Sequence, residues 1–165
     1  MNVRLSNFQT KQVDLQLTTD TVAYISGDVL VATVAVPMFG ATPPDPTRVK
    51  IESIEIIDKD AQSGAFDIVF LDDNKSLGTI NAAVSITDAD SLFVSGIIPV
   101  TASSYTALTA GGQAVAQPVL ANPVFVQTQA GSSNIYVGLI SRDTKTYTAS
   151  ALYLRLSVQY VSNVL

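Results

Sequence analysis

The sequence predicts an all-β fold, a two-sheet β-sandwich or jelly-roll-like domain with one short helix and an extended N-terminal arm. Three observations predict it. About eight short apolar segments recur along the chain, with Pro, Gly, Asp and Asn between them. Several of these segments alternate apolar and polar residues with the period of two that a half-buried strand requires. Only one short segment carries a helix-start signal, so helices should contribute little to the core.

The N-terminal part predicts an arm followed by the domain. Residues 1–11 are polar and unpatterned, and we expect them to form the extended arm. Val13, Leu15 and Leu17 then alternate with polar residues, which predicts the first strand. We expect residues 12–165 to form a single β-sandwich domain, since this length fits one domain.

Three further segments predict strands in the first half. Residues 29–36 are apolar on both faces and rich in β-branched side chains, which predicts a central strand. Pro37 ends it, and the prolines and glycine of residues 37–48 indicate a long loop. Residues 49–58 and 65–71 predict the two strands of a hairpin with a long tip between them.

The second half contains the helix signal and the closing strands. Thr87 and Asp90 fit a capping box, because a hydroxyl caps the first turn and a carboxylate follows three residues later. After a strand at 97–100, residues 101–117 are dominated by small residues and predict a flexible excursion. Three closing strands are expected at 124–127, 134–140 and 150–161. In the last of them, one face carries Leu152, Leu154, Leu156, Val158 and Tyr160.

Composition excludes several function classes. The chain has no His, Cys or Trp, which removes the usual proton shuttle, soft metal ligand and thiol nucleophile. Only 14% of residues are charged, against about 25% in an ordinary soluble domain. Such a surface indicates either extensive contact with other subunits or a polar, Thr-rich β surface. With nine Lys and Arg and a net charge of −5, we expect no nucleic-acid partner.

The sequence gives no sign of a membrane partner either. The longest apolar stretch, residues 29–39, is shorter than the roughly 20 residues of a spanning helix. The N-terminal residues lack the hydrophobic core of a signal peptide. We therefore expect no contact with a membrane.

Acidic residues form the strongest candidate for a chemical site. Hard cations such as calcium take several carboxylate oxygens, and Asp58-x-Asp60 resembles the start of a calcium loop. Gln62, Ser63 and Val69 then break the pattern. We favour the interpretation that these carboxylates stabilise turns and a helix cap by bonding nearby backbone. The candidates are Asp58, Asp60, Asp72, Asp73, Asp88 and Asp90.

Other constellations are weaker, and we expect no catalytic, cofactor-binding or metal-binding residues. Glu52 and Glu55, three apart on a strand, should point to opposite faces and so cannot flank one glycosidic bond. Serine has no His to activate it, although a Ser–Lys pair assembled by the fold stays open. No Lys follows Gly111 and Gly112 at the spacing of a phosphate loop. Five tyrosines are candidates for a sugar platform, but packing is the favoured interpretation: Tyr24, Tyr105, Tyr136, Tyr147 and Tyr153.

Two segments carry a resemblance to a known family. The first reads SIEIIDKD at residues 53–60, followed after a short spacer by FDIVFLDDN at 66–74. The second reads NAAVSITDAD at 81–90, followed by GIIPV at 96–100. This order resembles the capsid decoration or cement proteins of tailed bacteriophages. It covers about residues 50–100, less than a third of the chain.

The resemblance implies a β-sandwich or jelly-roll domain that assembles as a trimer on the outer capsid surface. It implies a structural virion protein and no enzyme, made in the host cytoplasm and placed on the expanded head. There it would bridge subunits of the major capsid protein, its expected partner. One alternative is a carbohydrate- or host-surface-binding β-sandwich module of a phage fibre or other surface structure. Another is a His-free hydrolase that uses Asp and a metal ion.

Overall fold

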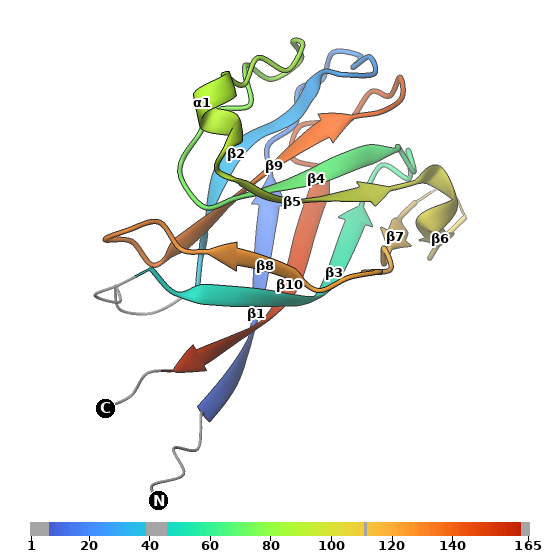
Figure 1. Cartoon of the computed structure of the whole chain (residues 1–165). Coiled ribbons are helices and arrows are strands. Elements are labelled where there is room, and N and C mark those ends of the chain that lie inside the picture. Colours follow the sequence, from blue (N-terminus) through green and yellow to red (C-terminus); the bar gives the residue numbers. More distant parts are fainter. Residues whose placement is uncertain (1–6, 39–45, 111, 163–165) are drawn as a thin grey trace, which may run out of the picture.

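The chain folds into two antiparallel β-sheets that pack face to face (Figure 1). The computed structural model describes residues 7–38, 46–110 and 112–162. The larger sheet has the order β1-β10-β3-β7-β6, with β8 also paired to β3, and the smaller has the order β2-β9-β4-β5. This confirms the predicted two-sheet sandwich. The strands are β1 (Asn7–Leu17), β2 (Val29–Pro37), β3 (Arg48–Asp58), β4 (Phe66–Leu71), β5 (Val94–Val100), β6 (Tyr105–Ala107), β7 (Ala114–Ala116), β8 (Val124–Gln127), β9 (Asn134–Ser141) and β10 (Leu152–Ser162).

The strand pairs are nested in the order of a jelly roll. The first strand pairs with the last, β1 with β10, and the second with the next to last, β2 with β9. Inside these, β3 pairs with β8 and β4 with β5. The short β6–β7 hairpin is inserted between β5 and β8 and extends the larger sheet along β3. A long hairpin rolled over on itself produces this nesting, which is the arrangement of double-sheet jelly rolls.

The core lies between the inner faces of the two sheets. On β10, Leu152, Leu154 and Leu156 are fully buried, as their alternation predicted. Opposite them on the smaller sheet lie the buried rings of Phe66 and Phe70. Burying side chains of this size stabilises the fold by about 1.5–3 kcal/mol each, relative to leaving them exposed.

A second apolar layer covers the outer face of the smaller sheet. Val29, Val69 and Tyr136 point outward from this sheet and are nevertheless buried. The segment between β4 and α1 packs over them, and Leu77 in that segment is 1% exposed. The predicted central position of residues 29–36 is therefore wrong, because β2 is the edge strand of its sheet. β2 is apolar on both faces because its inner face packs in the core between the sheets and its outer face is covered by this segment.

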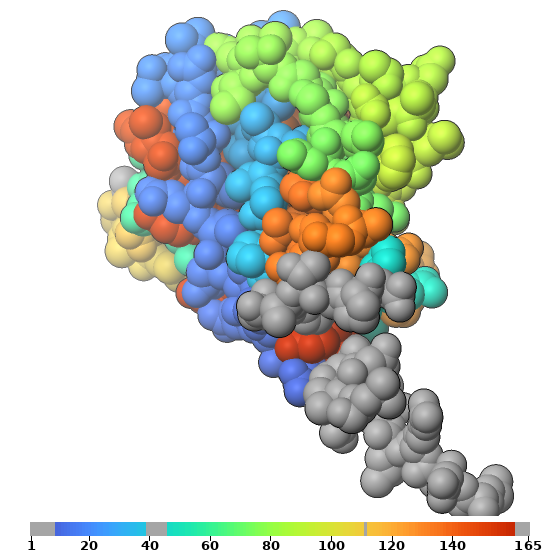
Figure 2. Space-filling view, turned by 90° about the vertical axis from the view of Figure 1, so that its left-hand side faces the viewer, coloured from blue at the N-terminus to red at the C-terminus, as the bar shows by residue number. Residues whose placement is uncertain are grey.

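The free edges of β1 and β2 lie next to each other on one side of the sandwich (Figure 2). Lys11 links them, since its ammonium donates to the carbonyl oxygens of Pro37 at 2.9 Å and Met38 at 3.3 Å. The expected arm differs in its boundary: residues 7–11 are the first half of β1, paired with β10. The rest of the predicted arm, residues 1–6, lies outside the described residues.

The only helix in the described part of the chain with α geometry is α1 (Asp88–Ser91). Its predicted start is confirmed, because the Thr87 hydroxyl accepts from the Asp90 N–H at 3.1 Å. Leu92 after it is 84% exposed, so the helix adds nothing to the core. No helix among the described residues is long and apolar enough to cross a membrane.

The predicted hairpin of residues 49–58 and 65–71 is wrong. β3 belongs to the larger sheet and β4 to the smaller, so the intervening turn carries the chain from one sheet to the other. After β3 the Lys59 N–H bonds the Ala151 carbonyl at 3.1 Å, whereas the Ala65 carbonyl before β4 accepts from Arg142 at 2.8 Å. Each strand pairs instead with a strand distant in sequence, β3 with β10 and β4 with β9, and these long-range pairings place the two strands in different sheets.

The predicted flexible excursion at residues 101–117 is also ordered in part. It contains a 3₁₀ turn at Ala102–Ser104 and the β6–β7 hairpin, while residue 111 lies outside the described residues. Tyr105 packs against the core, and Ala114 and Ala116 are buried. Small side chains on β7 allow this hairpin to lie close against β3.

Candidate functional site

The first pair of candidate carboxylates stabilises the turn between β3 and β4. Asp58 is fully buried and accepts from the N–H groups of Asp60 at 3.0 Å and Ser63 at 2.8 Å. Two residues of this turn, Ala61 and Ser63, have φ near +50°, which ordinary side chains rarely adopt. The carboxylate supplies the bonds that hold this strained backbone in place. Asp60 in turn accepts from the Thr148 hydroxyl at 2.9 Å.

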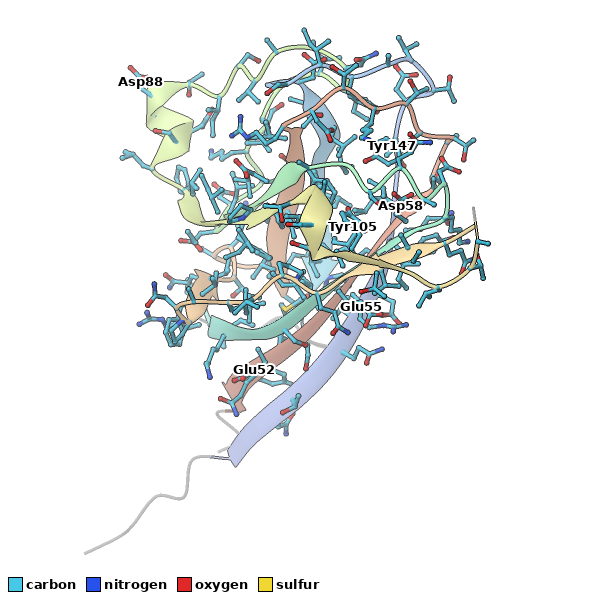
Figure 3. All side chains as sticks on the ribbon, turned by 90° about the vertical axis from the view of Figure 1, so that its right-hand side faces the viewer. Glu52, Glu55, Asp58, Asp88, Tyr105 and Tyr147 are labelled. Carbon is cyan, nitrogen blue, oxygen red and sulfur yellow. The ribbon has the colours of Figure 1, made fainter. Side chains whose placement is uncertain are left out.

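The remaining carboxylates lie elsewhere. Asp72 accepts from the Gln127 N–H at 2.7 Å and from the Ser95 hydroxyl, and so ties the end of β4 to β5 and β8. Asp73 and Asp90 share the ammonium of Lys75, at 3.3 and 3.6 Å. Asp88, on α1, lies on the far side of the molecule from Asp58 (Figure 3).

Asp58 and Asp73 fit the turn interpretation, because their carboxylates accept from backbone N–H groups within five residues, whereas Asp60 and Asp72 join distant segments. In the described part of the chain, no three acidic side chains come together in a way that could hold a metal ion. Four lysines bind carbonyl, carboxylate or phenol oxygens: Lys11, Lys50, Lys59 and Lys75.

Burial raises the pKa of the Asp58 carboxyl above its ordinary value, although the N–H bonds from Ser63 and Asp60 oppose the shift. The folded state therefore holds this proton more tightly than the unfolded chain. Its stabilising contribution is present below the unfolded pKa of about 3.9 and is lost as the pH rises through the folded value.

We expect wild type to lose stability relative to Asp58→Asn as the pH rises from about 3 to 7, because asparagine does not ionise. Urea unfolding of both proteins, followed by far-UV circular dichroism at a series of pH values, measures this difference. A wild type that gains stability relative to the variant over that range would contradict the assignment.

The two glutamates do not point to opposite faces as predicted. Ser157 lies opposite Ser53 and Val158 lies opposite Ile51, so Glu52 is an extra residue on β3 and forms a β-bulge. The bulge restores the inward face from Ile54 onward and leaves Glu52 and Glu55 lining the same hollow outside the larger sheet. Each carboxylate is ion-paired, Glu52 with Lys50 at 2.7 Å and Glu55 with Arg155 at 2.8 Å.

That bulge had a signal in the sequence. Val49 and Ile51 keep the inward face with a spacing of two, and the next inward residue, Ile54, comes three positions later. A single spacing of three inside a period-two strand indicates one extra residue.

Three of the five candidate tyrosines pack in the interior. Tyr24, Tyr136 and Tyr147 are buried, and the rings of Tyr24 and Tyr147 meet edge to face with centroids 6.3 Å apart. Tyr153 is half-buried beneath the Lys59 ammonium, 4.2 Å from the ring centre. The Tyr105 hydroxyl is buried without a hydrogen-bond partner among the described residues. The packing interpretation holds for the three buried rings.

The sequence did not predict an apolar groove of ≈ 470 Å³ between β5 and the segment that leads into β8. Three large side chains at this groove stay exposed: Val119 at 90%, Ile97 at 53% and Phe125 at 40%. Arg48 also lines it, with its guanidinium carbon 4.2 Å from the centre of the Phe125 ring.

Close backbone packing builds this groove. A Cβ on Gly96 would lie 2.9 Å from Cγ1 of Val124, so only glycine lets β5 approach β8 this closely. Asp72 holds the same two strands together through Ser95 and Gln127. The groove is therefore a fixed feature that joins the edges of the two sheets.

Comparison with known proteins gives only distant matches. No protein-family model matches the chain, and no curated protein is significantly similar to it in sequence. The virus-like particle protein of extra small virus from the prawn Macrobrachium rosenbergii is 16% identical with a TM-score of 0.37, covering 97% of this chain and 81% of that one. The capsid of cyanophage Pam1 is 9% identical with a TM-score of 0.35, covering 98% and 90%.

Distant matches also include a protein that is not viral. The K3 cleaved adhesin domain of Lys-gingipain from Porphyromonas gingivalis is 12% identical with a TM-score of 0.30, covering 81% of this chain and 75% of that one. At these identities and scores the likeness carries no argument about function. The chain is an all-β jelly roll with distant structural similarity to viral capsid proteins.

Proposed function

We propose that this protein is a structural component of a virion, a capsid decoration or cement protein on the outer surface of the expanded head. It would bridge subunits of the major capsid protein and stabilise the shell against internal pressure. In this role it acts by binding and performs no catalysis. It would be made in the host cytoplasm and assemble on the shell as a homotrimer.

The apolar groove between β5 and β8 is the observation that carries this proposal. Exposed apolar patches rimmed by polar residues mark protein interaction sites. Ile97, Val119 and Phe125 together offer the kind of apolar anchors that interfaces bury at their centres. Because Gly96 and Asp72 fix the two strands, this surface needs little ordering before it binds.

The charge at the groove and over the whole chain also supports a role in binding a protein partner. Arg48 is the one charged residue among those lining the groove, and it is exposed. A partner with apolar side chains and a carboxylate opposite Arg48 would complement it. The low overall charge of 14% also fits a protein that covers much of its surface with neighbours.

The resemblance of residues 50–100 to phage decoration proteins adds support from the same region. These residues form β3, β4, α1 and β5, and β5 supplies one wall of the groove. Repetition over many equivalent positions on a shell would turn a modest contact into a large stabilisation by multivalency. The proposal that the protein assembles as a trimer is based on this resemblance.

Binding to capsids tests the proposal directly. We expect the purified protein to co-sediment with expanded capsids that lack it and to raise their melting temperature. Ile97→Asp should weaken this binding at least tenfold, about 1.4 kcal/mol, because a charge would enter the apolar contact. Light scattering of the free protein should give about three times the 17.4 kDa chain mass if the trimer forms before binding.

A matched control separates the groove from general surface hydrophobicity. Ile25 is 61% exposed, close to Ile97 at 53%, and lies in the β1–β2 connection away from the groove. Ile25→Asp should bind capsids as wild type does. Absence of capsid binding by the wild-type protein would refute the proposal. An equal loss of binding in both variants would show that the groove is not the capsid-binding surface.

A further inference from the structure

We propose that the hollow on the outer face of the larger sheet binds a neutral saccharide. The hollow measures ≈ 470 Å³ and is lined by β1, β3, β10 and the segment that follows β7. It is separate from the apolar groove at β5 and β8, and this proposal does not depend on attachment to a capsid. The volume falls within the range of about 300–1,000 Å³ that is typical of small-molecule sites.

Two small side chains and a bulge create the hollow. Ser53 on β3 and Ser157 on β10 lie directly opposite each other, so the floor consists of two hydroxyl groups where larger side chains would fill the space. The extra residue, Glu52, places a second carboxylate on the outer face, further along β3 from Glu55 (Figure 3). Bulges commonly re-aim a side chain next to a functional site.

A network of polar side chains holds the walls in place. Arg155 donates to Asp14 at 2.7 Å and to Glu55 at 2.8 Å, which joins β1, β10 and β3 across the sheet. Gln117 donates to the second oxygen of Glu55 at 2.9 Å. Gln12 completes the row beside Asp14 at 3.3 Å. Side chains fixed in this way bind a ligand with little loss of conformational freedom.

The lining matches the chemistry of a sugar. Sugar hydroxyls both donate and accept, and the hollow offers carboxylates as acceptors, guanidinium as donor, and amides and serine hydroxyls as both. A guanidinium has five N–H donors and a carboxylate four lone-pair sites, so Arg155 and Glu55 retain capacity for a ligand. Pro118 and Leu120 supply an apolar wall for the C–H face of a sugar ring.

Charge selects a neutral ligand over an anionic one. The charged residues that line the hollow are Glu52, Glu55 and Arg155, and both ion pairs of Arg155 are with carboxylates of this chain. A uronic or sialic acid would meet an excess of negative charge. A neutral hexose or N-acetylhexosamine would experience no such charge repulsion.

The test uses a defined probe panel on the intact protein. We would titrate ¹⁵N-labelled protein with methyl glycosides and disaccharides of glucose, galactose, mannose and N-acetylglucosamine, following backbone amide shifts by NMR. At least one probe should give saturable shifts centred on Ser53, Glu55 and Ser157. Ser53→Tyr should fill the hollow and weaken that binding at least tenfold, about 1.4 kcal/mol.

Two further variants keep the result decisive. Gln117→Ala removes one wall group at an exposed position and should weaken binding without affecting the fold. Thr10→Tyr adds the same ring on the outer face of β1 and should bind as wild type does. The proposal is overturned if no probe gives saturable shifts, if the shifts map elsewhere, or if Ser53→Tyr binds unchanged.

Discussion

Phe70→Ala is expected to lower the free energy of unfolding by about 3–5 kcal/mol. The ring is fully buried on β4 between the two sheets. Truncation removes its transfer free energy and leaves a cavity that two hydrogen-bonded sheets cannot easily close. Because a domain is stable by only about 5–15 kcal/mol, this single change would remove a large part of the total.

Urea unfolding followed by far-UV circular dichroism measures this loss, and Phe125→Ala is its control. Phe125 is 40% exposed and lies under the Arg48 guanidinium, so its truncation should cost about 1 kcal/mol or less. Equal losses for the two phenylalanines would mean that the inter-sheet core is not organised around β4.

Gly64→Ala is expected to destabilise the protein by about 1–3 kcal/mol, although the change adds only one methyl group. A Cβ at this position would overlap the Tyr147 hydroxyl oxygen and would lie 3.1 Å from Cγ of Lys145. Tyr147 is 2% exposed and packs edge to face on Tyr24, so its ring has little room to withdraw. The cost therefore comes from steric overlap and not from backbone conformation.

A double variant distinguishes this cause from a general effect on the turn. Tyr147→Phe removes the hydroxyl oxygen that the new methyl group would meet. On that background Gly64→Ala should cost clearly less than it does in wild type, a coupling that a double-mutant cycle measures. Additive losses would show that the phenol oxygen is not the obstacle.

Individual strands were predictable because burial leaves a local pattern. In β10 every second residue from Leu152 to Val158 is buried, and the sequence shows this period directly. The cap at Thr87 was predictable for the same reason, since its partner Asp90 is three residues away. Structure that depends on interactions between residues close in sequence can be predicted from a single sequence.

Pairing between strands was less predictable. The turn after Asp58 looks like a hairpin tip in sequence, yet it carries the chain between two sheets because β3 finds β10 about a hundred residues later. The residues of one strand do not indicate which distant strand it will pair with. The same limit explains the assignment of β2 to the sheet centre, since only the covering segment around Leu77 accounts for its outer apolar face.

The candidate surfaces were the least predictable features. The groove arises where Gly96 lets two strands of different sheets approach, and the outer hollow arises from a bulge and from serines on strands that are neighbours only after folding. The turn interpretation holds for Asp58 and Asp73, whose carboxylates accept from backbone N–H groups within five residues. It missed the long-range roles of Asp60 and Asp72, whose partners are distant in the sequence.

The nested strand pairs also determine how the chain can reach its folded state. β4 and β5 are neighbours in sequence and can pair early, whereas β1 can pair only with β10, across nearly the whole chain. At synthesis rates of about 5–20 residues per second, β1 would wait on the order of ten seconds for β10 to be made. During that time its backbone donors and acceptors are open to other chains. We therefore expect folding to proceed from the middle of the sequence outward and to be completed when the first and last strands pair.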